Sequence, residues 1–379
     1  MYRLVVALLA AGLLFSQSKQ SPHKQSPQEL LNEAVTFQQQ GKLEDAIRDY
    51  DLFLDMYPDA AEARSNLGAA LAGVGRYSQA IDEYQLALLK KPDPKVRLNL
   101  AIAFYKAADY KDAASELSAL READATNIQV VMLLASSDLQ LGSNKDAIEL
   151  LTPLHQANGN DLGIAYLLGT ALARDGQTVQ AQLTVDEILR NGDSAEARLL
   201  LGTTKFSQHD FSQALVDIKK ALEMNPDLPD VYAYYGMVLL VMGDVKGSKD
   251  AFQKELARNP NNFDASLRLG ALLRVDQEYE QALPYLKHAL SLRPGDPTVR
   301  YQLASINLAE GKAEQARQEF EDLVKESPNF TEAHVSLAGI YYREKRKADG
   351  DKERAIVRDL NAKKQAQEPG AQAIPGQER

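Results

Sequence analysis

The chain has 379 residues, of which 45% are hydrophobic and 7% aromatic, and its formal net charge at pH 7 is −10. This acidic balance argues against a nucleic-acid-binding protein, which needs a basic face to neutralise phosphates. The sequence contains no cysteine. Disulfides, thiolate metal sites, cysteine nucleophiles and a lipid anchor on an N-terminal cysteine are therefore excluded.

The N-terminus has the pattern of a secretory signal peptide over residues 1–18. Arg3 precedes an apolar run from Leu4 to Phe15, and small residues follow at Ser16 and Ser18. The run is shorter than the ~20 residues that span a bilayer. We expect cleavage near Ser18 and export to the periplasm or the cell exterior. The alternative is an uncleaved apolar segment that anchors the chain or extends its first helix.

Residues 19–27 are polar and contain two Ser-Pro pairs, which predicts a disordered linker.

The segment Ala61–Pro94 shows the pattern on which the rest of the chain is built. It reads as two amphipathic helices, with Gly75 at the turn between them and Pro92 ending the second. Gly68 lies inside the first helix, where glycine is unfavourable by about 1 kcal/mol relative to alanine. We therefore expect a close helix–helix contact at Gly68, with the small residue Ala80 facing it.

This segment recurs along the chain at intervals of 33 or 34 residues. We number each repeat so that Gly68 is at position 8. Position 8 is then always glycine or alanine: Ala34, Gly68, Ala101, Ala135, Gly169, Gly202, Gly236, Gly270, Ala304 and Ala338. Position 20 is almost always alanine: Ala46, Ala80, Ala113, Ala147, Ala181, Ala214, Ser248, Ala282 and Ala316. A fixed period of this length indicates a stacked repeat architecture.

The period, the small residues, the aromatic residues at position 24 and the proline at position 32 resemble the tetratricopeptide repeat (TPR) family. Position 24 carries Tyr50, Tyr84, Phe252 and Phe320. The resemblance covers about residues 27–345 and implies an all-α fold, an α-α superhelix (TPR solenoid) of about nine full repeats plus a C-terminal capping unit. One departure is clear, because the chain has no tryptophan and position 4 never carries the family's usual indole.

The expected domains are a signal peptide (1–18), a linker (19–27), a TPR solenoid (28–345), a C-terminal capping helix (346–364) and a disordered tail (365–379). The capping assignment rests on Gly350 at position 20 and on the many charges of this segment, since a terminal unit must present a polar outer face. The segment looks like the C-terminal caps of exported bacterial TPR proteins. Residues 365–379 are rich in Gln, Pro, Gly and Ala.

Three repeats carry a polar residue at position 11, where the family usually has an aromatic one. Asp138, Lys205 and Asn307 are each followed by an apolar residue. We expect the apolar stripe of these helices to turn by about 100°, one residue of a helix, toward the inner face.

No constellation in the sequence points to catalysis. The five histidines lie far apart without metal-ligand spacing, and the HExxH, phosphate-loop and GxSxG patterns are absent. We expect a protein that is not an enzyme and that has no cofactor and no metal.

The remaining function is recognition of a protein or peptide partner. The resemblance implies that the first helix of each repeat lines a concave groove. We expect the partner-binding residues to be Tyr166, Arg174, Phe206, Tyr234, Met237, Leu240, Arg274 and Tyr301. Aromatic residues, Met and Arg are enriched where binding energy concentrates. The alternative is that these apolar residues pack against the neighbouring repeat. A carboxylate clamp, as some family members have, is hinted at by Asn66, Lys95 and Asn99.

Two functions follow from this pattern. The first is a non-enzymatic interaction scaffold of the bacterial periplasm or cell envelope, which binds a protein or peptide along its concave face. The alternative is a structural subunit of an envelope assembly for secretion, pilus formation or polysaccharide export, which contacts partners through its outer face and ends. In both cases we expect no nucleic acid, and membrane contact only indirectly through partners.

Overall fold

The computed structural model describes residues 26–190 and 192–367, and these residues form twenty α-helices and no strand. The predicted signal peptide, most of the predicted linker and residues 368–379 of the predicted tail lie outside the described residues. The chain divides into two compact units, one up to Val96 and one from Arg97.

The first unit contains two helix pairs: α1 (Pro27–Gln39) with α2 (Leu43–Met56), and α3 (Ala61–Gly73) with α4 (Tyr77–Lys90). The Ser26 side chain accepts a hydrogen bond from the Glu29 amide, and the Glu29 carboxylate accepts one from the Ser26 amide. This reciprocal cap starts α1 at Pro27, one residue before the predicted start of the solenoid. Between α3 and α4, Gly75 has a φ of +78°, a conformation that favours glycine.

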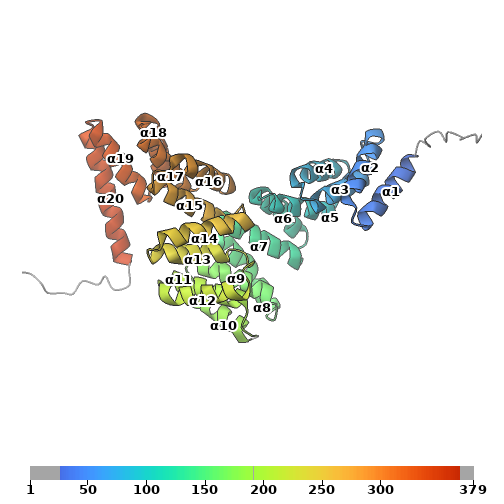
Figure 1. Ribbon diagram of the computed structural model, residues 1–379, viewed down its shortest axis with the longest axis horizontal. Helices are drawn as coiled ribbons and strands as arrows, with labels where there is room; N and C mark the ends of the chain where they lie inside the picture. The colour runs from blue at the N-terminus through green and yellow to red at the C-terminus, as the bar shows by residue number, and fades with distance from the viewer. Residues whose placement is uncertain (1–25, 191, 368–379) are drawn as a thin grey trace, which may run out of the picture. The chain divides into compact units, whose positions relative to one another are not determined.

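The second unit contains eight helix pairs, from α5, which begins just before the unit boundary, to α20. Their bounds are α5 (Pro94–Lys106), α6 (Tyr110–Ala123), α7 (Ile128–Leu141), α8 (Asn144–Ala157), α9 (Leu162–Arg174), α10 (Thr178–Arg190), α11 (Ala195–Ser207), α12 (Phe211–Met224), α13 (Val231–Val241), α14 (Val245–Arg258), α15 (Phe263–Val275), α16 (Tyr279–Leu292), α17 (Pro297–Ala309), α18 (Ala313–Glu326), α19 (Thr331–Arg343) and α20 (Lys347–Gln367). The last helix extends three residues beyond the predicted end of the capping helix at 364. The helices of this unit pack in consecutive pairs, and successive pairs lie against one another (Figure 1).

The small residue at position 8 makes room for the side chain at position 24 of the same pair. A Cβ atom added to Gly68 would lie 2.8 Å from Cε1 of Tyr84, and one added to Gly236 would lie 2.7 Å from Cε1 of Phe252. The expected close contact is therefore present, but the group that needs the space at Gly68 is the ring of Tyr84 and not Ala80. A glycine leaves room for an aromatic ring that an inserted methyl group would overpack.

The missing tryptophan at position 4 is replaced in several repeats by an ion pair within the helix pair. A basic residue at position 4 binds an acidic residue at position 23. The ion pairs include Arg64–Glu83 at 2.6 Å and Arg198–Asp217 at 2.8 Å, and in the last pair a hydrogen bond joins His334 Nδ1 to Glu353 Oε2 at 2.5 Å. A polar contact between the two helices thus takes the place of an apolar one in these repeats.

The polar residues at position 11 follow a related rule. Lys205 Nζ lies 2.8 Å from Asp217 Oδ2, and the Asn307 amide donates to Glu319 at 2.9 and 3.0 Å. Within the described residues Asp138 has no such partner, and burial together with the charge of Asp146 raises its pKa to about 6.

Candidate functional site

In the second unit, two arginines far apart in sequence bind the end of the same helix. The carbonyl oxygen of Leu139, in the last turn of α7, accepts hydrogen bonds from Arg174 Nη1 at 3.3 Å and from Arg293 Nη2 at 3.4 Å. Arg293 Nε also donates to the carbonyl of Gln140 at 2.5 Å. The last carbonyls of a helix lack intrahelical partners and carry partial negative charge, so cations stabilise them. The two arginines therefore join α7 to α9 and to the end of α16.

Arg174 also organises a polar network at the start of α13. Its Nε donates to the Tyr234 hydroxyl at 3.0 Å, and its Nη2 lies 3.1 Å from Asp230 Oδ2. Asp230 has a φ of +64°, which is unusual for a residue other than glycine. The Asn262 amide donates to Asp230 Oδ1 at 2.7 Å, so that α9, α13 and α15 meet at one carboxylate.

The low-polarity surroundings of this network shift the pKa values of its members. Burial alone would lower the pKa of Arg174, but the charges of Tyr234 and Asp230 raise it, so the guanidinium stays protonated. Burial raises the pKa of Asp230 despite the neighbouring Arg174. Burial lowers the pKa of Arg293, whose guanidinium also lies 3.8 Å from the ring centre of Phe263.

Glu255 on α14 lies beneath the same network and is 2% exposed. Its carboxylate accepts hydrogen bonds from the backbone amides of Asp230 and Ala233, both at 3.3 Å, and from the Asn262 side chain at 3.2 Å. Burial, and then the charge of Asp230, raise the pKa of Glu255 to about 7. A carboxyl group with this pKa changes charge near neutral pH.

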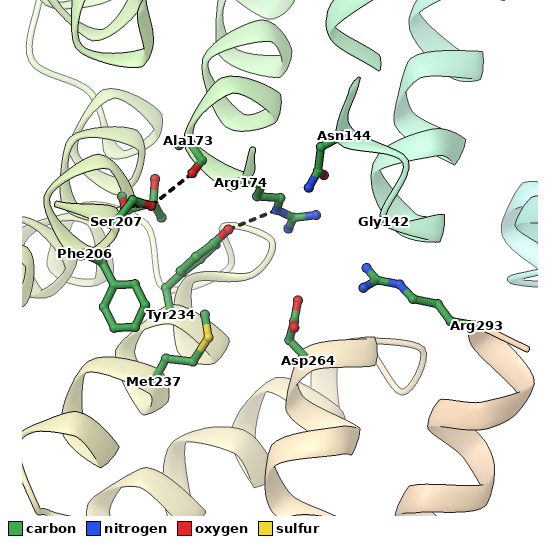
Figure 2. Close-up of a pocket in the computed structure, with 11 residues that line it drawn as sticks. Gly142, Asn144, Ala173, Arg174, Phe206, Ser207, Tyr234, Met237, Asp264 and Arg293 are labelled. Carbon is green, nitrogen blue, oxygen red and sulfur yellow. Dashed lines mark hydrogen bonds between the residues drawn. The ribbon is translucent and has the colours of Figure 1, made fainter. Parts of the chain in front are cut away.

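These elements enclose a cavity of about 240 Å³ on the inner face of the second unit (Figure 2). It is lined by Gly142, Asn144, Ala173, Arg174, Thr203, Phe206, Ser207, Tyr234, Met237, Asp264 and Arg293. One side of the cavity is polar, with two guanidinium groups, a carboxylate and an amide. The other side is formed by Phe206, Tyr234 and Met237. No covalent chemistry follows from this arrangement, which is suited to binding.

The structure brings four of the predicted partner-binding residues together at this cavity, namely Arg174, Phe206, Tyr234 and Met237. Tyr166, on α9, is close enough to this network for the charge of Asp230 to add to the effect of burial in raising its pKa. The apolar parts of Phe206, Tyr234 and Met237 pack against the protein's own core. Phe206 and Tyr234 are partly buried against Met237, and Tyr105 from α5 joins the same cluster. Much of the inner face at this level is thus filled by its own side chains.

The other three predicted residues lie away from the cavity. Leu240 is in the last turn of α13 and partly buried. Arg274, in the last turn of α15, donates from Nε to the Gln302 side chain at 2.5 Å. Tyr301 packs between Phe320 and Phe330, with ring centres 5.7 and 5.6 Å away.

Five polar residues of the cavity were not predicted from the sequence: Asn144, Thr203, Ser207, Asp264 and Arg293. Asp264 occupies position 2, which faces the groove in this family, so its position was a usable signal. Asn144 and Arg293 lie next to turns, and no repeat pattern marks them. Of the residues proposed for a clamp, Asn66 lines a separate hollow of about 280 Å³ in the first unit.

Two structural searches bear on cofactors and membranes. Among residues 26–190 and 192–367, no group of three or more His, Asp or Glu side chains is placed to hold a metal ion. In the same part of the chain, no helix combines the length and the apolar character needed to cross a bilayer.

Comparison with protein families identifies tetratricopeptide repeats in three segments of the chain, of which two overlap. One tetratricopeptide repeat family matches residues 31–97 and 236–297, and another matches residues 276–338. These segments cover most of the described part of the first unit and residues 236–338 of the second.

Curated relatives are distant. The CTR9 homolog of Arabidopsis thaliana is 25% identical over 271 residues, which cover 68% of this chain and 25% of the relative. The type IV pilus assembly protein PilF of Pseudomonas aeruginosa is 26% identical over 155 residues, which cover 40% of this chain and 62% of the relative. The chain thus spans less than two thirds of either protein.

Solved structures share the fold. The Cut9 and Hcn1 hetero-tetramer of APC/C matches with a TM-score of 0.52 at 13% identity, covering 90% of this chain and 88% of the other. A monomeric mutant of IFIT1 matches with a TM-score of 0.51 at 14% identity, covering 88% and 90%. At this level of identity the likeness establishes an all-α arrangement of paired helices of the TPR superhelix type, and only that.

Proposed function

Because the chain is a tetratricopeptide repeat protein, we propose that it is a non-enzymatic scaffold that binds a protein or peptide partner on the concave side of its second unit. Repeat arrays of this kind present extended concave surfaces for binding. The observation that carries the proposal is an exposed apolar strip at the ends of α13 and α15, described next.

The apolar strip consists of Leu240, Val241, Met242 and Val275. Val241 and Met242 are each 50% exposed, and Val275 is 63% exposed. Val241 and Val275 occupy position 13 of successive repeats, and equivalent positions of successive repeats are neighbours in such an array. A group of exposed apolar residues, unlike a single one, indicates an interaction site.

Arg274 adds a charge beside the strip. Only its Nε donates a hydrogen bond to another described residue, the Gln302 side chain, so its two terminal nitrogens are available to a partner. An arginine fork binds carboxylates with two parallel hydrogen bonds. The partner segment that fits this surface has apolar side chains and an acidic group. The cavity residues Arg174, Phe206, Tyr234 and Met237, with Tyr166 near their network, belong to the same proposed inner face. Tyr301 would extend this face into the next repeat.

A crosslinking pull-down from envelope fractions tests this surface. The double variant Met242→Asp, Val275→Asp places two charges in the strip, and we expect the amount of captured partner to fall at least tenfold. Both side chains are exposed, so the melting temperature should stay that of the unaltered chain. Equal capture by the folded double variant would exclude the strip as the binding surface.

A second function is supported by exposed apolar residues on the second helices of two pairs. Leu183 on α10 and Val216 on α12 both occupy position 22 and are 64% and 58% exposed, and Val179 is 69% exposed. These residues favour the alternative of a structural subunit that contacts an envelope assembly through its outer face. The likeness to a protein named for type IV pilus assembly supports the same alternative.

The matched double variant Leu183→Asp, Val216→Asp separates the two functions. In the scaffold proposal it captures the partner like the unaltered chain and serves as the control for the strip variant. If the outer face makes the contact, the loss occurs in this variant and not in the strip variant.

Export is the third part of the proposal and is supported by the Arg3, Leu4–Phe15 and Ser18 pattern. Mass spectrometry of the native protein should find an N-terminus near Lys19. A protein that begins at Met1 and is recovered from the cytosol would contradict export.

A further inference from the structure

The cavity of the second unit contains donors and acceptors that the protein itself does not use. Arg293 donates from Nε and Nη2, and within the described residues its Nη1 has no hydrogen-bond partner. The Asp264 carboxylate likewise accepts no hydrogen bond from residues 26–190 or 192–367. The buried Oδ1 atom of Asn144 has none either. Of these three residues, only Asn144 has a buried polar atom without a partner; Asp264 and Arg293 are partly buried, so their unused groups are open to a molecule in the cavity.

The unused groups face a common space. Figure 2 shows the Asp264 carboxylate, on α15, pointing into the gap between the guanidinium groups of Arg174 and Arg293. Asn144 lies beside Arg174 on the far side of the same gap, and Phe206 and Met237 close the cavity on its apolar side. Arg174 has five N–H groups, and three of them donate to Tyr234, Asp230 and Leu139.

The charges in the cavity define the ligand. A ligand with only a negative charge would be repelled by the carboxylate of Asp264. A ligand with only a positive charge would be repelled by the two arginines, so neither finds an opposite charge at every contact. A small molecule that carries both charges a few atoms apart satisfies both sides. The volume of about 240 Å³ is below the ~300–1,000 Å³ of sites for drug-sized ligands and accommodates a molecule about as large as one residue.

We propose that this cavity binds a free α-amino acid with an apolar side chain. The α-carboxylate accepts hydrogen bonds from Arg293 Nη1 and from an unused N–H of Arg174. The ammonium group donates to the Asp264 carboxylate. The side chain lies against Phe206 and Met237. This site is separate from the apolar strip, and the proposal does not depend on the identity of the protein partner.

Calorimetric titration of the full chain with leucine, methionine and phenylalanine tests the proposal directly. At least one of these amino acids should bind and raise the melting temperature. N-acetyl-leucine lacks the ammonium group and leucinamide lacks the carboxylate, so each should bind at least tenfold more weakly than leucine if leucine is the ligand. The absence of heat and of a melting shift with all three amino acids at millimolar concentration would overturn the proposal. Equal binding of the analogues would also overturn it.

The variant Asp264→Asn gives a second, opposite pair of effects. It should weaken binding of the amino acid at least tenfold, because the ammonium group loses its counter-charge. It should strengthen binding of the N-acetyl derivative, because the repulsion between Asp264 and the ligand carboxylate disappears. The charge of Asp264 acts on the pKa values of Arg174 and Arg293, so the melting temperature of the variant is measured to confirm that it remains folded. The control is Asp250→Asn, which removes the same charge from an exposed position on α14. If Asp264→Asn and the control bind both ligands alike, the assignment of Asp264 is wrong. Partner capture should be unchanged in both variants, so that a failure here is distinct from a failure of the scaffold proposal.

Discussion

The pair α11–α12 and the pair α19–α20 follow one sequence pattern but have different surroundings. In α11, a Cβ atom added to Gly202 would lie 2.5 Å from Cγ1 of Ile218 and 3.2 Å from the carbonyl oxygen of Ala214. In α19, a Cβ atom added to Gly339 would have no neighbour within 4 Å. Val335, one turn earlier, is 54% exposed. Gly202, at position 8, thus faces the second helix of its own pair, whereas Gly339, at position 9, and Val335 lie on a face of the last pair that no following repeat covers within the described residues.

The difference shows how a repeat chain ends. Position 24 carries Phe252 and Phe320 in covered pairs, both fully buried, but Arg354 in the last pair. Arg354 and Arg358 border an open hollow of about 600 Å³ between α19 and α20. Charged side chains keep this face soluble where an aromatic ring would be left in water. The residue type that a repeat position needs thus depends on whether a neighbouring repeat covers that position.

Removing α20 should have the largest effect on this comparison. A chain that ends at Arg346 loses the helix whose Glu353 binds the buried His334 and whose Gly350 lies against the ring of Tyr342. Losing these contacts leaves the buried His334 without a partner and exposes an aromatic side chain, so the loss amounts to several kcal/mol. We expect a lower melting temperature and association detectable by light scattering. The control is a chain that ends at Gln367 and keeps α20. If the shorter chain remains monomeric and as heat-stable as this control, α20 is not a cap.

Enlarging the two glycines should give unequal effects. Gly202→Leu inserts a side chain where the neighbours are already in contact, and overpacking of this kind lowers the free energy of unfolding by about 1–3 kcal/mol. Gly339→Leu enters open space and, because leucine is the better helix former, should leave stability equal or higher. Chemical denaturation of both variants measures the difference. Equal destabilisation would mean that the last pair is as enclosed as an interior one.

A smaller effect should come from the buried carboxyl group of the interior pair α13–α14. The pKa of Glu255 is about 7 in the fold, against an ordinary value of 4.5, so the folded protein retains a proton that the unfolded chain releases. The stabilisation that Glu255 contributes is therefore fully present below pH 4.5 and is lost as the pH rises through 7. At about 1.4 kcal/mol per pH unit, the free energy of unfolding should fall by about 2 kcal/mol between pH 5.5 and 7.

The variant Glu255→Gln should lack this decline, because its amide does not titrate. Unfolding free energies of both proteins across this pH range provide the measurement, with Glu223→Gln at an exposed position of α12 as the control. A parallel pH dependence in the unaltered chain and in Glu255→Gln would contradict the raised pKa.

The smallest expected effect is one that the two regions should share. Asp217 in α12 and Glu353 in α20 occupy position 23 and bind Arg198 and His334 at position 4. These contacts lie within a helix pair and do not depend on the next repeat. Asp217→Asn and Glu353→Gln keep an acceptor oxygen at a buried position, so each should lower the free energy of unfolding by only about 1 kcal/mol, the lower end of the effect of disturbing a buried hydrogen bond. A loss in α11–α12 alone would show that the neighbouring repeats determine the strength of this contact too.

Much of the fold followed from local pattern, and less of the site did. The small residues at position 8 and the turn at Gly75 predicted the helix pairs, because both requirements arise within one repeat. The predicted contact partner of Gly68, Ala80, was wrong, because the choice between Ala80 and Tyr84 depends on how the two helices are rotated about their axes. Positions 4 and 23 could have been read as an ion pair from the recurring basic and acidic residues 19 apart, as in Arg198 and Asp217.

By itself, the sequence determined the period and the all-α fold, because both depend on spacings within a repeat or between adjacent repeats. It also selected Arg174, Phe206, Tyr234 and Met237, which the structure brings together at one cavity. Only the tertiary structure decided that Arg293 reaches the end of α7, more than 150 residues earlier in the chain, and thereby completes a cavity. The physical reason is cumulative: each repeat adds a small rotation to the last, and only their sum over several repeats brings two distant turns together.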